Sequence, residues 1–165
     1  MNKIIKVTKG TGEGLTELSA FDNALQNAGI SNYNLIYLSS VIPYGYEPKL
    51  EKPAVNESEF GHRLYVVIAS QKESRVGYEA WAGIGWVMAD GSTGSPQETS
   101  KGGLFVEHHG ETEDEVKDLI TKSLNTMKAN RAEKYGEIKH EISGIKCAKE
   151  PVCALVAAVY KSENW

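Results

Sequence analysis

Asn34-Leu-Ile-Tyr-Leu-Ser-Ser-Val-Ile-Pro43 is the stretch around which the rest of the chain is organised. Its apolar residues 35–38 leave no polar face, which is typical of a strand buried on both sides. Ser39 and Ser40 end this strand, and Pro43 stops further strand pairing. A hydroxyl pair at a strand end can aim a side chain at a peptide carbonyl held under strain, although ordinary turn chemistry explains most Ser-Ser pairs.

The patterns on either side of this stretch predict an α+β or mixed α/β fold with helices packed outside the sheets. Ser19 is the expected N-cap of a short helix over 19–28 that ends at Gly29. A capping box of Thr112 and Glu115 begins the clearest helix, whose apolar face is expected to cover a sheet and which extends over 112–129. Strands are expected over 3–8, 34–38, 64–69, 77–89, 104–107, 136–142 and 152–160.

Three segments predict irregular structure. Gly10-Thr-Gly-Glu-Gly14 lacks the lysine of a phosphate-binding loop, so we expect a loop with positive φ, with close backbone approach to a ligand as the lesser alternative. Residues 44–59 contain two prolines and little periodicity, which predicts an arm that covers a site or a neighbouring subunit. Residues 91–101 are polar and rich in glycine, which predicts another loop.

Length and charge limit the class of protein. The chain has 165 residues, which fits a single domain over 1–165 with a proper core. A formal net charge of -4 without a basic block argues against nucleic acid or an anionic membrane as a partner. No apolar run approaches the ~20 residues of a membrane span, and the N-terminus lacks a signal-peptide core, so a cytoplasmic protein is expected.

The cysteines and histidines predict no metal site. Cys147 and Cys153 could pair, but reduced thiols in or near the core are expected in a cytosolic protein. Two cysteines without clustered histidines do not form a zinc site. His108 and His109 are adjacent on an expected strand and point to opposite faces, so they receive no catalytic role.

Four segments carry a resemblance to a known family. Ser19-Ala-Phe-Asp-Asn-Ala-Leu-Gln-Asn-Ala-Gly-Ile30, followed by the stretch 34–43, resembles the signature of the pyruvoyl-dependent arginine decarboxylases. Gly103-Leu-Phe-Val-Glu107 and Cys153-Ala-Leu-Val-Ala-Ala-Val-Tyr160 match the same family. The resemblance covers nearly the whole chain and is weakest over 44–59. It implies an α+β fold, a layered α/β sandwich of mostly antiparallel sheets covered by helices. It also implies a homotrimer that converts L-arginine to agmatine and carbon dioxide, with the site where two subunits meet.

The resemblance also implies that the peptide between Ser39 and Ser40 breaks itself. Ser40 Oγ would attack the carbonyl of Ser39 to form an ester. Elimination and hydrolysis would then release ammonia and leave a pyruvoyl group at position 40, dividing the protein into a β chain, 1–39, and an α chain, 40–165. Asn34 matches the family's donor to the tetrahedral oxyanion, and a turn residue at the start of the strand is the alternative.

In this family the pyruvoyl carbonyl acts as the cofactor, without a metal, by forming a Schiff base with the substrate amine and taking up electrons as carbon dioxide leaves. Glu107 matches the acid that reprotonates the α-carbon. Its pKa must then be raised, and burial among its apolar neighbours 104–106 is the expected cause. A solvent-facing glutamate at a strand end is the alternative.

The resemblance implies that substrate choice depends mainly on Asp22, which matches the family's aspartate that faces the guanidinium. A guanidinium donates two parallel hydrogen bonds to one carboxylate, a geometry that lysine or histidine substrates cannot supply. The alternative is an acid favoured by the dipole in the first turn of a helix.

Two rival functions stay open. One is the same cofactor acting on histidine or aspartate. The other is an unprocessed, non-catalytic trimeric binding domain, against which the joint presence of Asn34, Ser39, Ser40 and Glu107 argues. Polyamine synthesis and acid resistance through arginine exchange are both compatible with an arginine decarboxylase.

Overall fold

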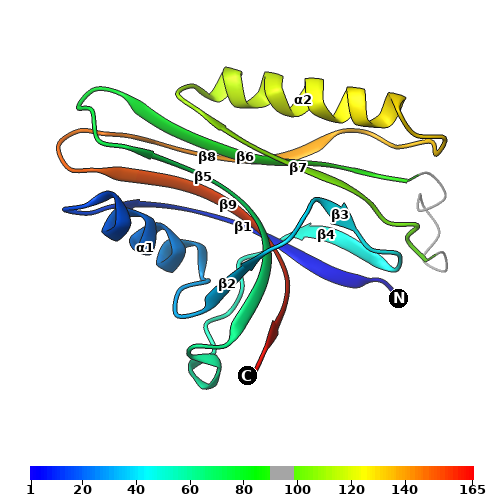
Figure 1. Cartoon of the computed structure of the whole chain (residues 1–165), viewed down its shortest axis with the longest axis horizontal. Helices are drawn as coiled ribbons and strands as arrows, with labels where there is room; N and C mark the ends of the chain where they lie inside the picture. The colour runs from blue at the N-terminus through cyan, green and yellow to red at the C-terminus, as the bar shows by residue number, and fades with distance from the viewer. Residues whose placement is uncertain (90–98) are drawn as a thin grey trace.

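The computed structural model describes residues 1–89 and 99–165, which form two sheets packed face to face between two α-helices (Figure 1). The layers follow the order α1, five-stranded sheet, four-stranded sheet, α2. This arrangement confirms the predicted α+β layered sandwich. Only the β2–β5 and β1–β4 pairings are parallel among the described strands.

The elements have the following bounds. The five-stranded sheet contains, in spatial order, β2 (Asn34–Tyr37), β5 (Arg63–Glu73), β9 (Val152–Glu163), β1 (Lys3–Glu13) and β4 (Tyr46–Leu50). The four-stranded sheet contains β3 (Val41–Ile42), β7 (Gly103–Gly110), β6 (Glu79–Met88) and β8 (Lys139–Lys146). The helices are α1 (Glu17–Ala28), α2 (Glu113–Ala129) and a 3-10 turn, η1 (Glu57–Glu59).

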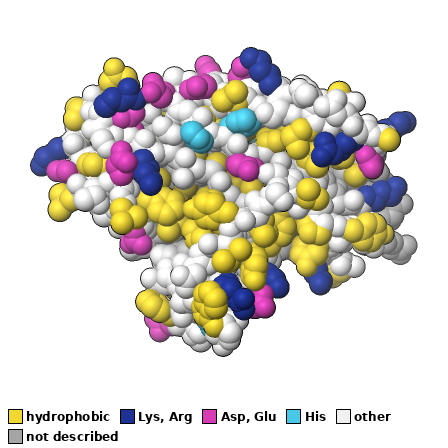
Figure 2. Space-filling model, in the orientation of Figure 1, with side chains coloured by type: hydrophobic (Ala, Val, Ile, Leu, Met, Phe, Trp, Pro, Cys, Tyr) yellow, Lys and Arg dark blue, Asp and Glu magenta, His cyan; other side chains and the backbone are white. Residues whose placement is uncertain are grey.

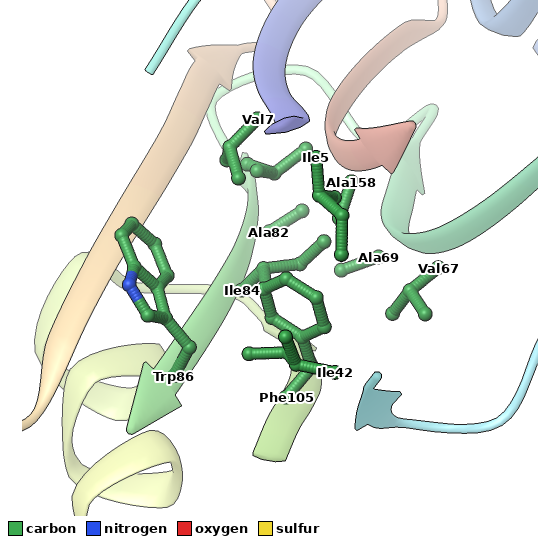
Figure 3. Packing of buried hydrophobic residues seen from close by; sticks show 11 residues of the cluster. Ile5, Val7, Ile42, Val67, Ala69, Ala82, Ile84, Trp86, Phe105 and Ala158 are labelled. Carbon is green, nitrogen blue, oxygen red and sulfur yellow. The ribbon is translucent and has the colours of Figure 1, made fainter. Parts of the chain in front are cut away.

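The core between the sheets contains apolar side chains from both sheets (Figure 3). Ile42 and Phe105 are almost fully buried there, at 2% and 0% exposure, and their side chains pack together. Both residues belong to strands that border the serine pair, because Ile42 is on β3 and Phe105 is on β7. The inter-sheet core therefore anchors the backbone on the downstream side of Ser40.

Helix α1 begins three residues earlier than Ser19 would place it. Thr16 is its N-cap, and Ser19 instead completes the capping box by accepting the Thr16 N–H. The expected loop over 10–14 was also wrong, since Gly10 and Gly12 lie inside β1 without positive φ. A side chain at either glycine would overlap the backbone of α1, so these glycines serve close packing of the helix on the sheet.

Helix α2 matches its prediction closely. Thr112 is the N-cap and accepts the Glu115 N–H, while the Glu115 carboxylate accepts the N–H of Glu111 rather than that of the cap. The buried face of the helix packs on β6, where small residues bring the two backbones close.

A Gly85→Ala substitution is expected to destabilise the fold by about 1–3 kcal/mol. The added methyl group would overlap Ile120 of α2, which is fully buried and cannot move aside without displacing its neighbours. Urea unfolding followed by circular dichroism measures this loss. A decrease in the free energy of unfolding of less than about 0.5 kcal/mol would show that α2 shifts outward without destabilising the fold.

The apolar strand 34–38 is not buried on both sides. Strand β2, which covers residues 34–37 of it, is an edge strand of the five-stranded sheet, and Tyr37 is 64% exposed. An edge strand has only one paired neighbour, and Leu35 and Ile36 of β2 are only partly buried. Exposed apolar side chains gather over the β2 and β3 region in Figure 2. Tyr37, Val41 and Tyr44 are exposed apolar residues of this part of the chain.

Several other boundaries also differ from the predictions. The expected irregular arm over 44–59 contains β4, which pairs in parallel with β1, followed by η1. The last-but-one strand begins at Lys139 rather than at 136. Most of the loop predicted over 91–101 lies outside the described residues. Cys147 and Cys153 are buried free thiols, as expected. The helices described here are all too short or too polar to cross a bilayer.

Candidate active site

Ser39 and Ser40 occupy the point where the chain crosses from one sheet to the other (Figure 1). On the upstream side, the Leu38 N–H donates to Val66 O at 2.8 Å and extends the β2–β5 ladder. On the downstream side, Val41 already pairs with Leu104 of β7. The serine pair is thus held at both ends by different sheets.

The Ser40 hydroxyl meets the carboxylate of Glu107. Ser40 Oγ donates to Glu107 Oε2 at 2.7 Å, although the two residues are 67 positions apart in the chain. Alternation along β7 explains the placement, because Phe105 and Glu107 face one side and Leu104 and Val106 face α2. The expected burial of Glu107 was wrong for this chain, since Glu107 is exposed and two of its three apolar neighbours point away from it.

Two backbone hydrogen bonds fix the peptides on both sides of residue 40. The Val41 N–H donates to Ser39 O at 3.0 Å and closes a three-residue turn centred on Ser40. The Phe105 N–H donates to Ser40 O at 3.0 Å. The carbonyl that Ser40 Oγ would attack is therefore already polarised by a donor. Sequence reasoning missed both donors, because backbone amides carry no residue-type signal.

The other two predicted site residues lie away from the serine pair. Asn34 begins β2, and its side-chain amide donates to Gly61 O at 2.7 Å. Asp22 is on the exposed face of α1, where its carboxylate accepts a hydrogen bond from Gln26 at 2.9 Å. Asp22 is the sixth residue of the helix, so it is not the first-turn acid considered as the alternative; Glu17 is.

The histidine pair is divided between two surfaces. His108 Nε2 lies 2.7 Å from Ser123 Oγ of α2, and burial lowers the pKa of His108. His109 is exposed on the opposite face of β7. Across residues 1–89 and 99–165, no group of three or more His, Cys, Asp or Glu side chains is arranged to hold a metal ion.

The sequence profile of the family described as pyruvoyl-dependent arginine decarboxylase (PvlArgDC) matches residues 4–164. The chain belongs to this family. Among curated members, the pyruvoyl-dependent arginine decarboxylase of Thermococcus kodakarensis is 33% identical over 90% of this chain and 88% of its own length. The Halobacterium salinarum protein of the same name is 36% identical over 73% of this chain and 69% of its own length.

A solved structure of pyruvoyl-dependent histidine decarboxylase at pH 8 is also similar in part. It is 15% identical, with a TM-score of 0.42, and the match covers 66% of this chain and 57% of that chain.

Proposed function

We propose that this chain cleaves itself between Ser39 and Ser40 and then decarboxylates L-arginine to agmatine and carbon dioxide. The observation that carries the proposal is the 2.7 Å hydrogen bond from Ser40 Oγ to Glu107, at a serine pair that connects a strand of one sheet to a strand of the other. Membership of the pyruvoyl-dependent arginine decarboxylase family supports both the self-cleavage and the substrate.

Self-cleavage begins with Ser40 Oγ. A serine hydroxyl is a weak nucleophile and needs a base, and the Glu107 carboxylate accepts its proton as Oγ bonds to the carbonyl carbon of Ser39. The Val41 N–H is a donor to the oxyanion that develops on Ser39 O. The C–N bond then breaks, the Ser40 nitrogen takes up a proton, and an ester joins the two residues.

The ester then breaks by elimination. Loss of the residue 40 α-proton expels the Ser39 carboxylate and leaves a dehydroalanine, which takes up water and releases ammonia. The products are a β chain, 1–39, and an α chain, 40–165, with a pyruvoyl group at its start. We further propose that the intact chain 1–165 is a single domain before this step.

The residues around position 40 fit a pyruvoyl group. The carbonyl carbon of residue 40 becomes part of the group, and its oxygen already accepts the Phe105 N–H at 3.0 Å. When formed, the group supplies an electrophilic carbonyl that withdraws electrons from the substrate. Glu107 faces the same atoms and is the group that returns a proton to the substrate α-carbon after carbon dioxide leaves. No metal is required in this scheme.

We also propose that the active unit is a homotrimer of cleaved subunits. Asn34 lies roughly 13 Å from Leu38 along an extended strand, so its side chain cannot reach Ser39 O of its own chain. Its proposed role as an oxyanion donor therefore belongs to a site shared with a neighbouring subunit. We propose that Asp22, on the exposed face of α1, faces the guanidinium in the same shared site. Exposed apolar side chains on β2 and β3 support such a contact.

A cytoplasmic location is part of the same proposal. Two buried free thiols support it, because disulfides form mainly in oxidising compartments.

An Asp22→Asn substitution is expected to raise the KM for arginine about tenfold to a hundredfold with little change in kcat. Asparagine keeps the size of the side chain but removes the charge that a guanidinium pairs with in two parallel hydrogen bonds. Steady-state assay of agmatine formation measures both constants. Glu17→Gln in the first turn of the same helix is the control, and an unchanged KM for Asp22→Asn would remove Asp22 from the substrate site.

Intact mass spectrometry under denaturing conditions tests the proposed function directly. We expect two fragments that meet between Ser39 and Ser40, the larger lighter by one ammonia than a fragment beginning with serine. Arginine must then yield agmatine and carbon dioxide, whereas histidine and aspartate must not react. A single full-length mass of 18.1 kDa would contradict the proposal in favour of an unprocessed binding domain.

A further inference from the structure

Tyr160 of β9 connects the five-stranded sheet to the segment that follows the serine pair. Its hydroxyl donates to Val41 O at 2.8 Å, although Val41 belongs to the four-stranded sheet. Val41 is the residue whose N–H donates to Ser39 O. The Tyr160 hydroxyl thus binds the carbonyl of Val41, the residue whose N–H closes the turn around Ser40.

The ring of Tyr160 also packs on β7. Its edge-to-face contact with Phe105 has a centroid separation of 6.3 Å and an interplanar angle of 66°. Phe105 is the residue whose N–H donates to Ser40 O. Tyr160 therefore contacts both residues that fix the backbone at position 40, through its hydroxyl on one side and its ring on the other.

The phenol stays protonated under ordinary conditions. Burial raises the pKa of Tyr160 above its usual value, and the negative charge of nearby Glu107 raises it further. The hydroxyl is therefore a hydrogen-bond donor throughout the physiological pH range.

We infer that Tyr160 is a positioning residue, which holds Val41 and the carbonyl of residue 40 in register with Glu107 during both self-cleavage and turnover. This inference rests on the proposed function. Nothing in the residue types of the motif 34–43 indicates it, because Tyr160 is 119 positions from Val41 in sequence.

Cleavage makes the hydrogen bond from the Tyr160 hydroxyl to Val41 O more important. When the peptide after Ser39 breaks, the turn closed by the Val41 N–H is lost, and residue 40 becomes a chain end. Among the bonds described above, those that survive are the Phe105 N–H to the residue 40 carbonyl and the Tyr160 hydroxyl to Val41 O. A new chain end without such support would sample orientations that are unproductive toward Glu107.

The test is Tyr160→Phe, which keeps the ring and its packing on Phe105 but removes the donor. We expect kcat per cleaved subunit to fall about tenfold, KM for arginine to stay within about twofold, and the rate of self-cleavage to fall. Tyr65→Phe is the matched control, because Tyr65 is on the neighbouring strand β5 and its hydroxyl bonds to Glu163 instead. Replacing Tyr160 with 4-aminophenylalanine, which restores an N–H donor, is expected to recover most of kcat.

Three results would overturn the inference. The first is a Tyr160→Phe protein that cleaves and turns over at the wild-type rates. The second is an equal loss of kcat in Tyr65→Phe, and the third is no recovery with 4-aminophenylalanine; either of these last two would indicate a general effect on the sheet. Failure of the proposed function itself is distinguishable, because the wild-type protein would then stay uncleaved or inactive.

Discussion

A Ser40→Ala protein is expected to remain a single 18.1 kDa chain and to release no carbon dioxide from arginine. Alanine lacks the oxygen that attacks the carbonyl of Ser39, and without the resulting ester no elimination can follow. The effect on activity should be complete, because loss of the nucleophile removes the cofactor as well. Denaturing mass spectrometry and radiolabelled carbon dioxide release measure the two consequences separately.

Ser70→Ala on β5 is the control for the Ser40 substitution, since it makes the same change on a strand of the neighbouring sheet. It should cleave and turn over normally. Agmatine formation by purified Ser40→Ala protein would contradict the proposed chemistry, whatever its fold.

A Glu107→Gln substitution is expected to lower kcat by at least about a hundredfold, because an amide can neither accept the Ser40 hydroxyl proton nor return a proton to the substrate carbon. Self-cleavage should slow as well, since the 2.7 Å acceptor of the Ser40 proton is lost. Activity must therefore be expressed per cleaved subunit, with the cleaved fraction measured by mass spectrometry.

Glu141→Gln is a close control for Glu107→Gln. Both glutamates lie opposite Ile84 of β6, one on β7 and the other on β8, so they occupy equivalent rows of the same sheet. Glu141 pairs with Lys9 rather than with the serine site. Wild-type kcat in Glu107→Gln, with cleavage intact, would exclude Glu107 from both steps.

The sequence predicted the elements that are specified locally. Helix α2 could be located from its capping residues and its periodic apolar face, because both signals act within a few residues. The glycines at 10 and 12 were misinterpreted because their role is contact with α1, and the sequence does not show which backbone lies opposite a glycine. Strand β2 was assigned to a buried position because an apolar run looks the same in a core and at an exposed edge.

The candidate site likewise contains residues that the sequence predicted and contacts that only the structure shows. Resemblance named Ser40 and Glu107, and the fold brings them within hydrogen-bond distance. The donors at Val41 and Phe105 are backbone amides, and the contact of Tyr160 with Val41 joins strands of different sheets. Such contacts depend on register and sheet packing, so they could be found only in three dimensions.

The position of β1 decides what happens to the protein after it has been cut. This strand belongs to the 1–39 fragment, yet it lies between β9 and β4 and pairs with β9 from Lys6 to Glu13. The smaller fragment thus contributes a strand that pairs on both sides with strands of the larger fragment. These pairings keep the cleaved enzyme assembled without a covalent link. Unfolding is a different matter: two separate chains must then find each other, so recovery becomes bimolecular and falls with dilution. The uncut precursor, as one chain, would refold without that dependence on concentration.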